Sequence, residues 1–367
     1  MKLILVIAVG YLAARVAFDW LARHLLIISG AEYLVLGFLA GPRVTGVLGS
    51  EALDSFAPFL TLAIGWLGVR VGMELYFPAL IRVRGVMWRL AFVQSLITLT
   101  LVAAVSTVAL SWLFHVGYSY ALLPSLVLGA VATCSASQGI QVMRGLGREG
   151  PLVRQLEVAS GVDAFVAIVT VAAVFSLNHV PTPGLGRTPT AVEWVVIDVL
   201  VGLVGGGLFH LFLGEERNVD RLFIALAGAI IFITGAATYL QLSPVLPGML
   251  LGMILVNTSR ARDRIQETLG KVARPLYFVL LICGGAIWQP GSDVVLPVLL
   301  FLCLRYVGKV GGARLAARAN GMLPVVGPGW GRALLGQGGL AIALALNYLL
   351  TNNAVLQNIV FTAAVAS

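Results

Sequence analysis

Charged side chains are scarce in this sequence. Of its 367 residues, only 11% are charged and 59% are hydrophobic, and the mean hydropathy is +0.97. Soluble domains carry roughly 25% charged residues, so this chain has too little charge to cover a water-facing surface. About a dozen stretches instead approach the ~20 apolar residues that a helix needs to cross a membrane. The composition therefore predicts an all-α polytopic membrane protein.

Cysteine and histidine are also sparse. The three cysteines, Cys134, Cys283 and Cys303, lie in apolar stretches without a CxxC pair, and the four histidines show neither HxxxH nor HExxH spacing. This pattern argues against a disulfide framework and predicts no transition-metal site and no cofactor. The chain also has no GxSxG motif and no paired-aspartate motif, so we do not expect an enzyme.

Basic residues, which give a net charge of +8, occur in short groups between the apolar runs. This spacing is typical of membrane topology signals and not of a nucleic-acid surface. The apolar runs predict thirteen membrane helices, at 2–20, 26–41, 54–76, 87–113, 118–143, 154–177, 190–213, 219–240, 244–258, 271–289, 293–317, 329–350 and 352–366.

Arginine and lysine concentrate in the loops that follow odd-numbered helices. The positive-inside rule then places the N-terminus outside and the C-terminus in the cytoplasm, and we expect a bacterial inner membrane. No small-residue cleavage site follows the first apolar run, so we interpret it as a retained helix and not as a signal peptide.

The chain shows a faint internal similarity between residues 1–177 and 219–367, which flank a predicted linker helix at 190–213. Each half has a short glycine-containing helix near its start, with Leu36-Gly37-Phe38-Leu39 in one and Leu251-Gly252-Met253-Ile254 in the other. An offset of seven helices would turn the second copy over and give an inverted repeat. Alternatively, both are ordinary glycines of helix packing.

Two predicted helices are interrupted by small and polar residues. The fifth contains Ala132-Thr133-Cys134-Ser135-Ala136-Ser137-Gln138-Gly139, and the twelfth contains Leu335-Gly336-Gln337-Gly338-Gly339. Interrupted helices at matching positions of two halves mark transport sites. We therefore expect two crossing discontinuous helices, with Ser137, Gln138, Gln337, Gly338 and Gly339 at the site. The alternative is a pair of continuous helices that pack through small residues.

Asp163 lies within the sixth predicted helix, with at least seven apolar or small residues after it. A central Asp costs about 2.5–3.5 kcal/mol on insertion scales, so one is rarely retained without a role. A desolvated carboxyl can hold either a proton or a cation, which coupled exchange requires. The alternative is an Asp that a neighbouring Arg neutralises and that serves only the structure.

Arg305 and Lys309 are basic residues within the eleventh predicted helix, one turn apart on one face. Lys309 is near enough to the cytoplasmic end for its side chain to extend to the membrane surface. It is also, with Arg305, a candidate charge partner of the site. Arg305 is deeper. We expect it to be the partner of a buried carboxylate or of the C-terminal end of a broken half-helix.

Taken in order, these residues resemble the transmembrane domain of the monovalent cation/proton antiporters, especially the second family with its Kef-type and bacterial sodium/proton exchangers. The resemblance rests on five stretches: Leu36-Gly37-Phe38-Leu39-Ala40-Gly41-Pro42, Gly72-Met73-Glu74-Leu75, Ala132-Thr133-Cys134-Ser135, Ser160-Gly161-Val162-Asp163, and Arg305-Tyr306-Val307-Gly308-Lys309 with Gln337-Gly338-Gly339.

This resemblance implies a homodimer that exchanges Na⁺ or K⁺ for H⁺ by alternating access. It implies that Asp163 binds the ion, that Arg305 is the buried basic residue, and that Thr133 and Ser135 lend oxygen ligands. Kef-type relatives often continue into a nucleotide-binding domain, so a cytoplasmic regulatory domain or partner chain is implied too.

Val162 departs from the pattern, because the family has a second acid or an Asn at this place. One carboxylate instead of two predicts electroneutral exchange of one cation for one proton. The departure also leaves a second function open, a non-transporting membrane module that serves as an ion sensor or as the anchor of a complex. A third is a carrier of organic anions that would hold a carboxylate with Arg305 and half-helix N-termini.

Overall fold

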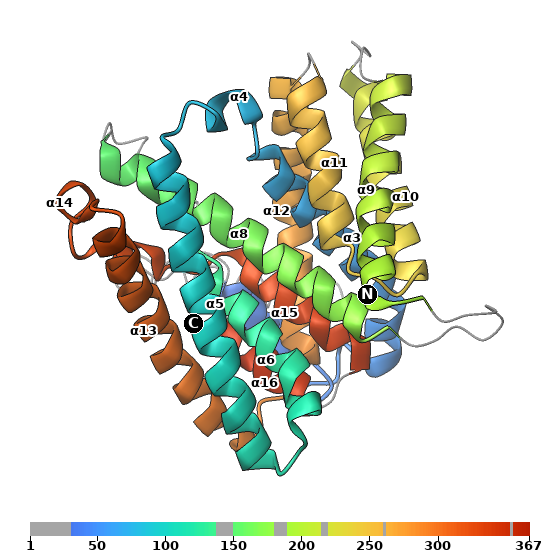
Figure 1. Ribbon diagram of the computed structural model, residues 1–367. Helices are drawn as coiled ribbons and strands as arrows, with labels where there is room; N and C mark the ends of the chain where they lie inside the picture. The colour runs from blue at the N-terminus through green and yellow to red at the C-terminus, as the bar shows by residue number, and fades with distance from the viewer. Residues whose placement is uncertain (1–30, 137–149, 180–188, 214–218, 260–261, 353–354) are drawn as a thin grey trace.

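The computed structural model describes residues 31–136, 150–179, 189–213, 219–259, 262–352 and 355–367. Within these ranges the chain is helical and has no strand (Figure 1). Six of the described helices are long and apolar enough to cross a membrane, and five shorter helices are also apolar. The prediction of an all-α polytopic membrane protein is therefore confirmed.

Helices in the first half of the chain are α2 (Ala31–Ala40), α3 (Ser50–Met73), α4 (Phe77–Leu80), α5 (Gly85–Phe114), α6 (Tyr118–Thr133) and α8 (Pro151–Leu177). They are followed by α9 (Ala191–Leu213), α10 (Val219–Tyr239), α11 (Val245–Thr258), α12 (Arg262–Ile287), η1 (Ser292–Val294), α13 (Val295–Ala319), α14 (Leu323–Val326), η2 (Trp330–Leu334), α15 (Gly339–Asn352) and α16 (Val355–Ala366).

Most predicted helices coincide with these elements. The first predicted helix, at 2–20, lies outside the described residues, as does the end of the fifth. One boundary was wrong, because α12 begins at Arg262 and not at residue 271. The twelfth predicted helix is broken, as expected, into a 3₁₀ turn and α15. The first turns of α12 carry charged residues, so apolar periodicity does not indicate where this helix begins.

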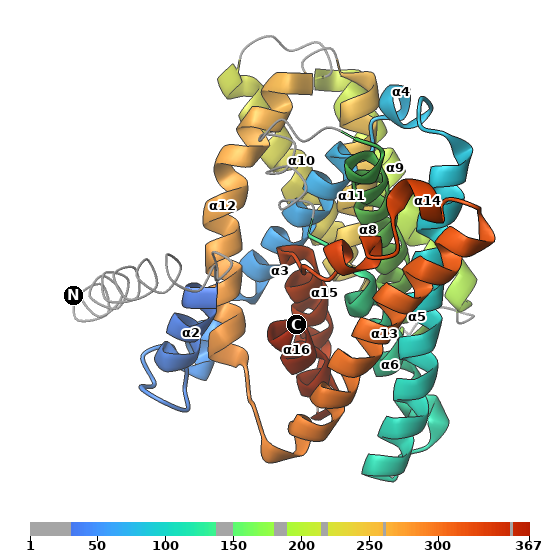
Figure 2. The ribbon, with the colours of Figure 1, turned by 90° about the vertical axis from the view of Figure 1, so that its left-hand side faces the viewer.

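The helices form two bundles. The site bundle consists of α5, α6, α8, α13, α15 and α16, and the flanking bundle of α2, α3, α9, α10, α11 and α12, each set packed mainly on its own members. Figure 2 shows α2 and α12 on one side of the molecule and α5 and α13 on the other. The bundles meet where α8 packs on α9 and α11, and where α15 packs on α3 and α12.

Glycines bring pairs of helices in the flanking bundle into backbone contact. A Cβ atom added to Gly252 of α11 would lie 2.1 Å from the carbonyl oxygen of Val69 in α3, and one on Gly72 of α3 would lie 2.0 Å from that of Met249. Gly37 approaches Ile282 of α12 in the same way. Both glycines of the internal similarity, Gly37 and Gly252, therefore pack helices.

Replacing Gly252 by Ala is expected to destabilise the protein by about 1–3 kcal/mol, because the added methyl group would push α11 away from α3. The matched control is Gly235→Ala in α10, where a Cβ would meet nothing within 4 Å. This control gains helix propensity of up to about 1 kcal/mol and should not lower stability. Thermal unfolding of the purified protein in detergent measures both, and equal melting temperatures would contradict the close contact.

Candidate functional site

Two unwound segments cross in the site bundle. Helix α6 ends at Thr133, with Cys134 to Ala136 non-helical, and residues 335–338 separate η2 from α15. The backbone N–H of Ala136 donates to the Gly336 carbonyl at 2.8 Å, and Gln337 Nε2 donates to the Val131 carbonyl at 3.0 Å. The interruptions predicted from the sequence are therefore present, and each supplies partners for the backbone of the other.

Five residues were predicted to lie at the crossing, and the structure describes three of them. Gln337, Gly338 and Gly339 lie at the second unwound segment, where Gly338 faces Ala136 and Gly339 begins α15. Ser137 and Gln138, the remaining two, lie outside the described residues.

Asp163 and Lys309 form a buried ion pair beside this crossing. Lys309 Nζ lies 2.6 Å from Asp163 Oδ2, and neither side chain is exposed at all. The ammonium also donates to Ser135 Oγ at 2.8 Å and to the Thr133 carbonyl. An ammonium has three N–H donors, so all of them are used. A carboxylate, a hydroxyl and a carbonyl freed by the end of α6 thus surround one positive charge.

Ser135 links the pair to the end of η2, next to the second unwound segment. Its Oγ lies 2.7 Å from Asp163 Oδ2 and 3.1 Å from the Leu334 carbonyl. A hydroxyl has one proton to donate, so it can bond only one of these acceptors at a time. The Thr133 hydroxyl donates to the Ala130 carbonyl inside α6, so Thr133 turns its carbonyl and not its hydroxyl toward Lys309.

The other carboxylate oxygen of Asp163, Oδ1, is buried and has no hydrogen-bond partner among the described residues. Buried carboxylate oxygens are normally satisfied, so an orphaned one calls for an explanation. With Oδ2 occupied by Lys309 and Ser135, Oδ1 is the atom that can accept a proton or contact a cation without first breaking the pair.

Arg305 lies one turn from Lys309 and is 5% exposed. Its Nη2 donates to the Cys134 carbonyl at 3.4 Å, and its Nε has no partner among the described residues. The guanidinium therefore sits at the C-terminal end of α6, where the helix dipole favours a positive charge. This is one of the two positions that we expected for it.

Of the two interpretations of Lys309, the structure shows the charge partner. Its side chain does not extend to the membrane surface but is fully buried on Asp163. The physical reason is a close helix contact: Gly308 packs against Thr98 of α5, and Gly312 against Ile97. These small residues hold α13 against α5, so the face with Lys309 turns inward toward the end of α6.

Val162 points away from the ion pair. It is 2% exposed and belongs to an apolar cluster with Leu90 of α5 and Ala313 of α13. The pair therefore has one carboxylate, as the sequence indicated. Among the described residues, no group of three His, Cys, Asp or Glu side chains could hold a metal ion.

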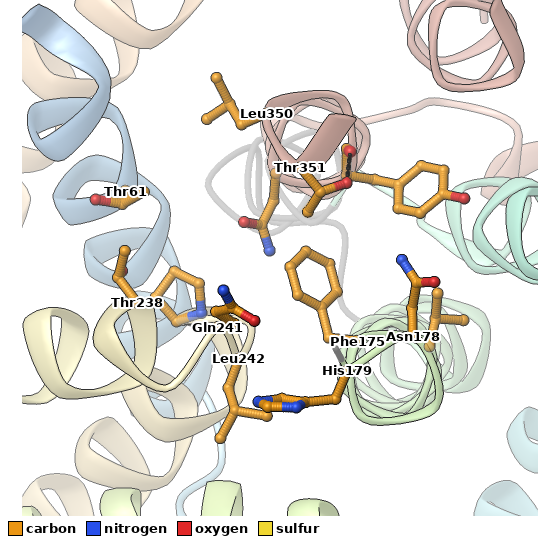
Figure 3. A pocket seen from close by; sticks show the side chains of 13 residues that line it. Thr61, Phe175, Asn178, His179, Thr238, Gln241, Leu242, Leu350 and Thr351 are labelled. Atoms are coloured by element: carbon orange, nitrogen blue, oxygen red, sulfur yellow. Dashed lines mark hydrogen bonds between the residues drawn. The ribbon is translucent and has the colours of Figure 1, made fainter. Parts of the chain in front are cut away.

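A cavity of about 320 Å³ lies between the two bundles, away from the ion pair. Its lining has amides, hydroxyls and one imidazole but no carboxylate, lysine or arginine: Thr61, Val174, Phe175, Asn178, His179, Thr238, Gln241, Leu242, Pro244, Asn347, Tyr348, Leu350 and Thr351. Figure 3 shows Asn178 and Phe175 of the α8 end opposite Gln241 and Thr238. This cavity could not be predicted from the sequence, because polar residues at helix ends carry no distinctive signal.

No protein-family model matches the chain, and no curated protein matches its sequence. Two solved structures of the sodium proton antiporter MjNhaP1 from Methanocaldococcus jannaschii match its fold. For the structure at pH 8, the TM-score is 0.68 with 16% identity, over 100% of this chain and 94% of the antiporter. For the electron-microscopy map, the TM-score is 0.66 with 15% identity, over 98% and 92%. At such identities the match establishes the fold, which is that of a sodium/proton antiporter.

Proposed function

We propose that this protein is a secondary antiporter that exchanges a monovalent cation for protons through Asp163. The observation that carries the proposal is the buried Asp163–Lys309 pair at the crossing of two unwound segments. An anchor or scaffold has no use for two charges inside the membrane, since each is costly to bury. The antiporter fold of the whole chain supports the same function.

In this mechanism the Lys309 ammonium occupies the place of the transported ion. Asp163 Oδ2, Ser135 Oγ and the Thr133 carbonyl are oxygen atoms, which can replace the water shell of Na⁺ or K⁺. An entering cation displaces the ammonium from the carboxylate, and a returning proton restores the pair. Cation and proton therefore compete for one site, which is the condition for obligatory exchange.

The site has a place for one exchanged charge. Suppose first that the transported proton binds Asp163. The proton-loaded site, with neutral Asp163 and Lys309⁺, then has the same total charge as the cation-loaded site, with the Asp163 carboxylate, Lys309⁺ and Na⁺. Suppose instead that the transported proton binds Lys309. The proton-loaded site is then the Asp163–Lys309 ion pair, and it has the same total charge as the cation-loaded site, with the Asp163 carboxylate, Na⁺ and neutral Lys309. Both routes exchange one cation for one proton, so we propose that transport is electroneutral.

The cavity between the two bundles is our candidate for the outer entrance. It lies at the ends of α8 and α10 that are remote from the arginine-rich starts of α5 and α10, which we assign to the cytoplasm by the positive-inside rule. Movement of the site bundle against the flanking bundle would then open Asp163 to one side at a time. A bacterial inner membrane and a homodimer complete the proposal.

We also propose that the halves form an inverted repeat. Helix α2 packs on α12, and α11 packs on α3, each through glycines. An offset of seven helices pairs α2 with α11 and α3 with α12, so these two contacts would be copies of each other.

The test is ion exchange by the reconstituted full chain. Addition of Na⁺, K⁺ or Li⁺ to proteoliposomes holding a proton gradient should dissipate the gradient, as a pH-sensitive dye reports. We expect at least one of the cations to act, with a rate that does not change when valinomycin and K⁺ set different membrane potentials. A current that reverses with potential would contradict electroneutral exchange.

One observation favours a second function. Asp163 and Lys309 are sealed from water in this arrangement, as they would be in a module that only senses or anchors. Such a module could bind cations without moving them. Cation-dependent thermal stabilisation without any dissipation of the proton gradient would support the sensor and end the proposal of exchange.

A further inference from the structure

Asp198 is a second acid buried in the membrane region. It is the eighth residue of α9, and its side chain is completely inaccessible. Both carboxyl oxygens are without a hydrogen-bond partner among the described residues. Asp163, by contrast, has Lys309 and Ser135 on one oxygen. Asp163 is therefore buried with a basic partner and a hydrogen-bond donor, whereas Asp198 is buried with neither among the described residues.

Neighbours on the same helix face define the position of Asp198. Residues four apart lie on one face of a helix. Trp194, one turn earlier, stacks on the ring of His179, just beyond α8, with the ring centroids 3.7 Å apart. Gly202, one turn later, faces Pro247 and Leu250 of α11. Asp198 thus lies on the face of α9 turned toward α8 and α11, where the two bundles meet.

The described helices that pack on α9 place no lysine or arginine at this level. The nearest imidazole, His179, lies one turn away against Trp194, with its Nε2 2.9 Å from the Leu240 carbonyl oxygen. Helix α9 packs on α8, α10 and α11. Between Asp163 and His179, the α8 segment has no ionisable residue, and α11 has none over its whole length. The ionisable residues of α10 are confined to its two ends, and α9 adds two more near its own ends: Asp220, Arg221 and Tyr239 on α10, and Glu193 and His210 on α9.

An unpaired carboxylate cannot be kept in such surroundings. A buried ion without a partner loses its hydration and gains nothing in return, so the group takes up a proton and becomes neutral. A neutral carboxyl without hydrogen bonds still has a desolvation cost, but a far smaller one. Burial and isolation together therefore require a protonated side chain.

We propose that Asp198 is a second proton-binding site, separate from the Asp163–Lys309 pair and occupied in this arrangement of the two bundles. Its ligand is the proton alone, because two oxygens of one carboxyl offer a metal cation too few donors. Since α8 and α9 belong to different bundles, a movement that admits water between them would hydrate Asp198 and release this proton. The site does not depend on exchange by Asp163, so it stands if the proposed function fails.

Infrared spectroscopy of the reconstituted full chain tests the proposal. A protonated carboxyl without hydrogen bonds absorbs at the high-frequency end of the C=O stretch region. We expect such a band in the native protein, its loss in Asp198→Asn, and its retention in the matched control Asp163→Asn. Absence of the band from the native protein, or its survival in Asp198→Asn, would overturn the proposal.

A measurement on the native chain covers the case in which Asp198→Asn does not fold. Hydrophobic carbodiimides add to protonated carboxyls within membranes and leave a stable acylurea, which mass spectrometry locates on a peptide. An adduct on Asp198 supports the site. A protein in which Asp198 remains unlabelled excludes it.

Discussion

Replacing Asp163 by Asn is expected to reduce cation-driven proton movement to the level of protein-free liposomes. Asparagine keeps the shape of the side chain but can neither bind a proton at neutral pH nor offer a negative charge to a cation. Lys309 would then be buried without a counter-charge. We expect this to lower the stability of the protein by about 3–5 kcal/mol, the usual cost of removing one partner of a buried ion pair. The measurement is dye-reported exchange in proteoliposomes.

Glu157→Gln is the matched control, since Glu157 lies on the same helix and is half-buried outside the ion pair. This control should exchange cations at the rate of the native protein. Native-like exchange by Asp163→Asn would show that another group carries the ions, and the proposed mechanism would have to be abandoned.

Lys309→Met is expected to destabilise the protein by about 3–5 kcal/mol, because it leaves the Asp163 carboxylate buried without a partner. Adding Asp163→Asn to Lys309→Met should restore most of this loss, since a neutral pair of similar volume needs no counter-charge. Thermal unfolding of the native protein, both single variants and the double variant gives the coupling energy. Neither Lys309→Met nor the double variant should exchange cations, because both lack the ammonium that competes with the transported cation for the site.

The exposed pair of Lys271 and Glu267 provides the contrast. Its atoms are 2.8 Å apart, much like the buried pair, but both side chains are about 70% exposed. Lys271→Met should therefore change stability by no more than about 1 kcal/mol.

The outcome that would contradict coupling in the buried pair is additivity. If the stability losses of Asp163→Asn and Lys309→Met simply add in the double variant, the pair contributes no coupling energy.

Much of the fold could be predicted because the membrane leaves few alternatives. Apolar runs of sufficient length must be helices, since no water satisfies the backbone inside the bilayer. The same rule makes a polar interruption such as Thr133 to Ser135 informative, because it requires partners from another segment. Asp163 could be singled out for a similar reason, as a charge that apolar surroundings do not tolerate without cause.

Which of the two basic residues pairs with Asp163 could not be predicted. Arg305 and Lys309 lie on one helix face, and depth along the helix favoured Arg305. The packing of α13 against the end of α6 decides the pairing. The Cys134 carbonyl accepts from Arg305, and the Thr133 carbonyl accepts from Lys309, which also reaches Asp163. A sequence does not reveal which turn of α13 faces which carbonyl.

Asp198 was missed for a different reason. Its signal was available, an acid eight residues into a long apolar run, but no interruption or resemblance drew attention to α9. The burial of Asp198 and its lack of a partner depend on how α8, α10 and α11 pack on α9, which the sequence alone does not reveal.

The hydrogen bond between the Ala136 amide and the Gly336 carbonyl has a consequence for the dynamics of the crossing. This amide can exchange its hydrogen with solvent only when the two unwound segments separate. Its exchange rate therefore reports the opening of the crossing itself, as distinct from fraying of either helix. A cation that holds the segments together would slow this single amide, while one that binds elsewhere would leave it unchanged.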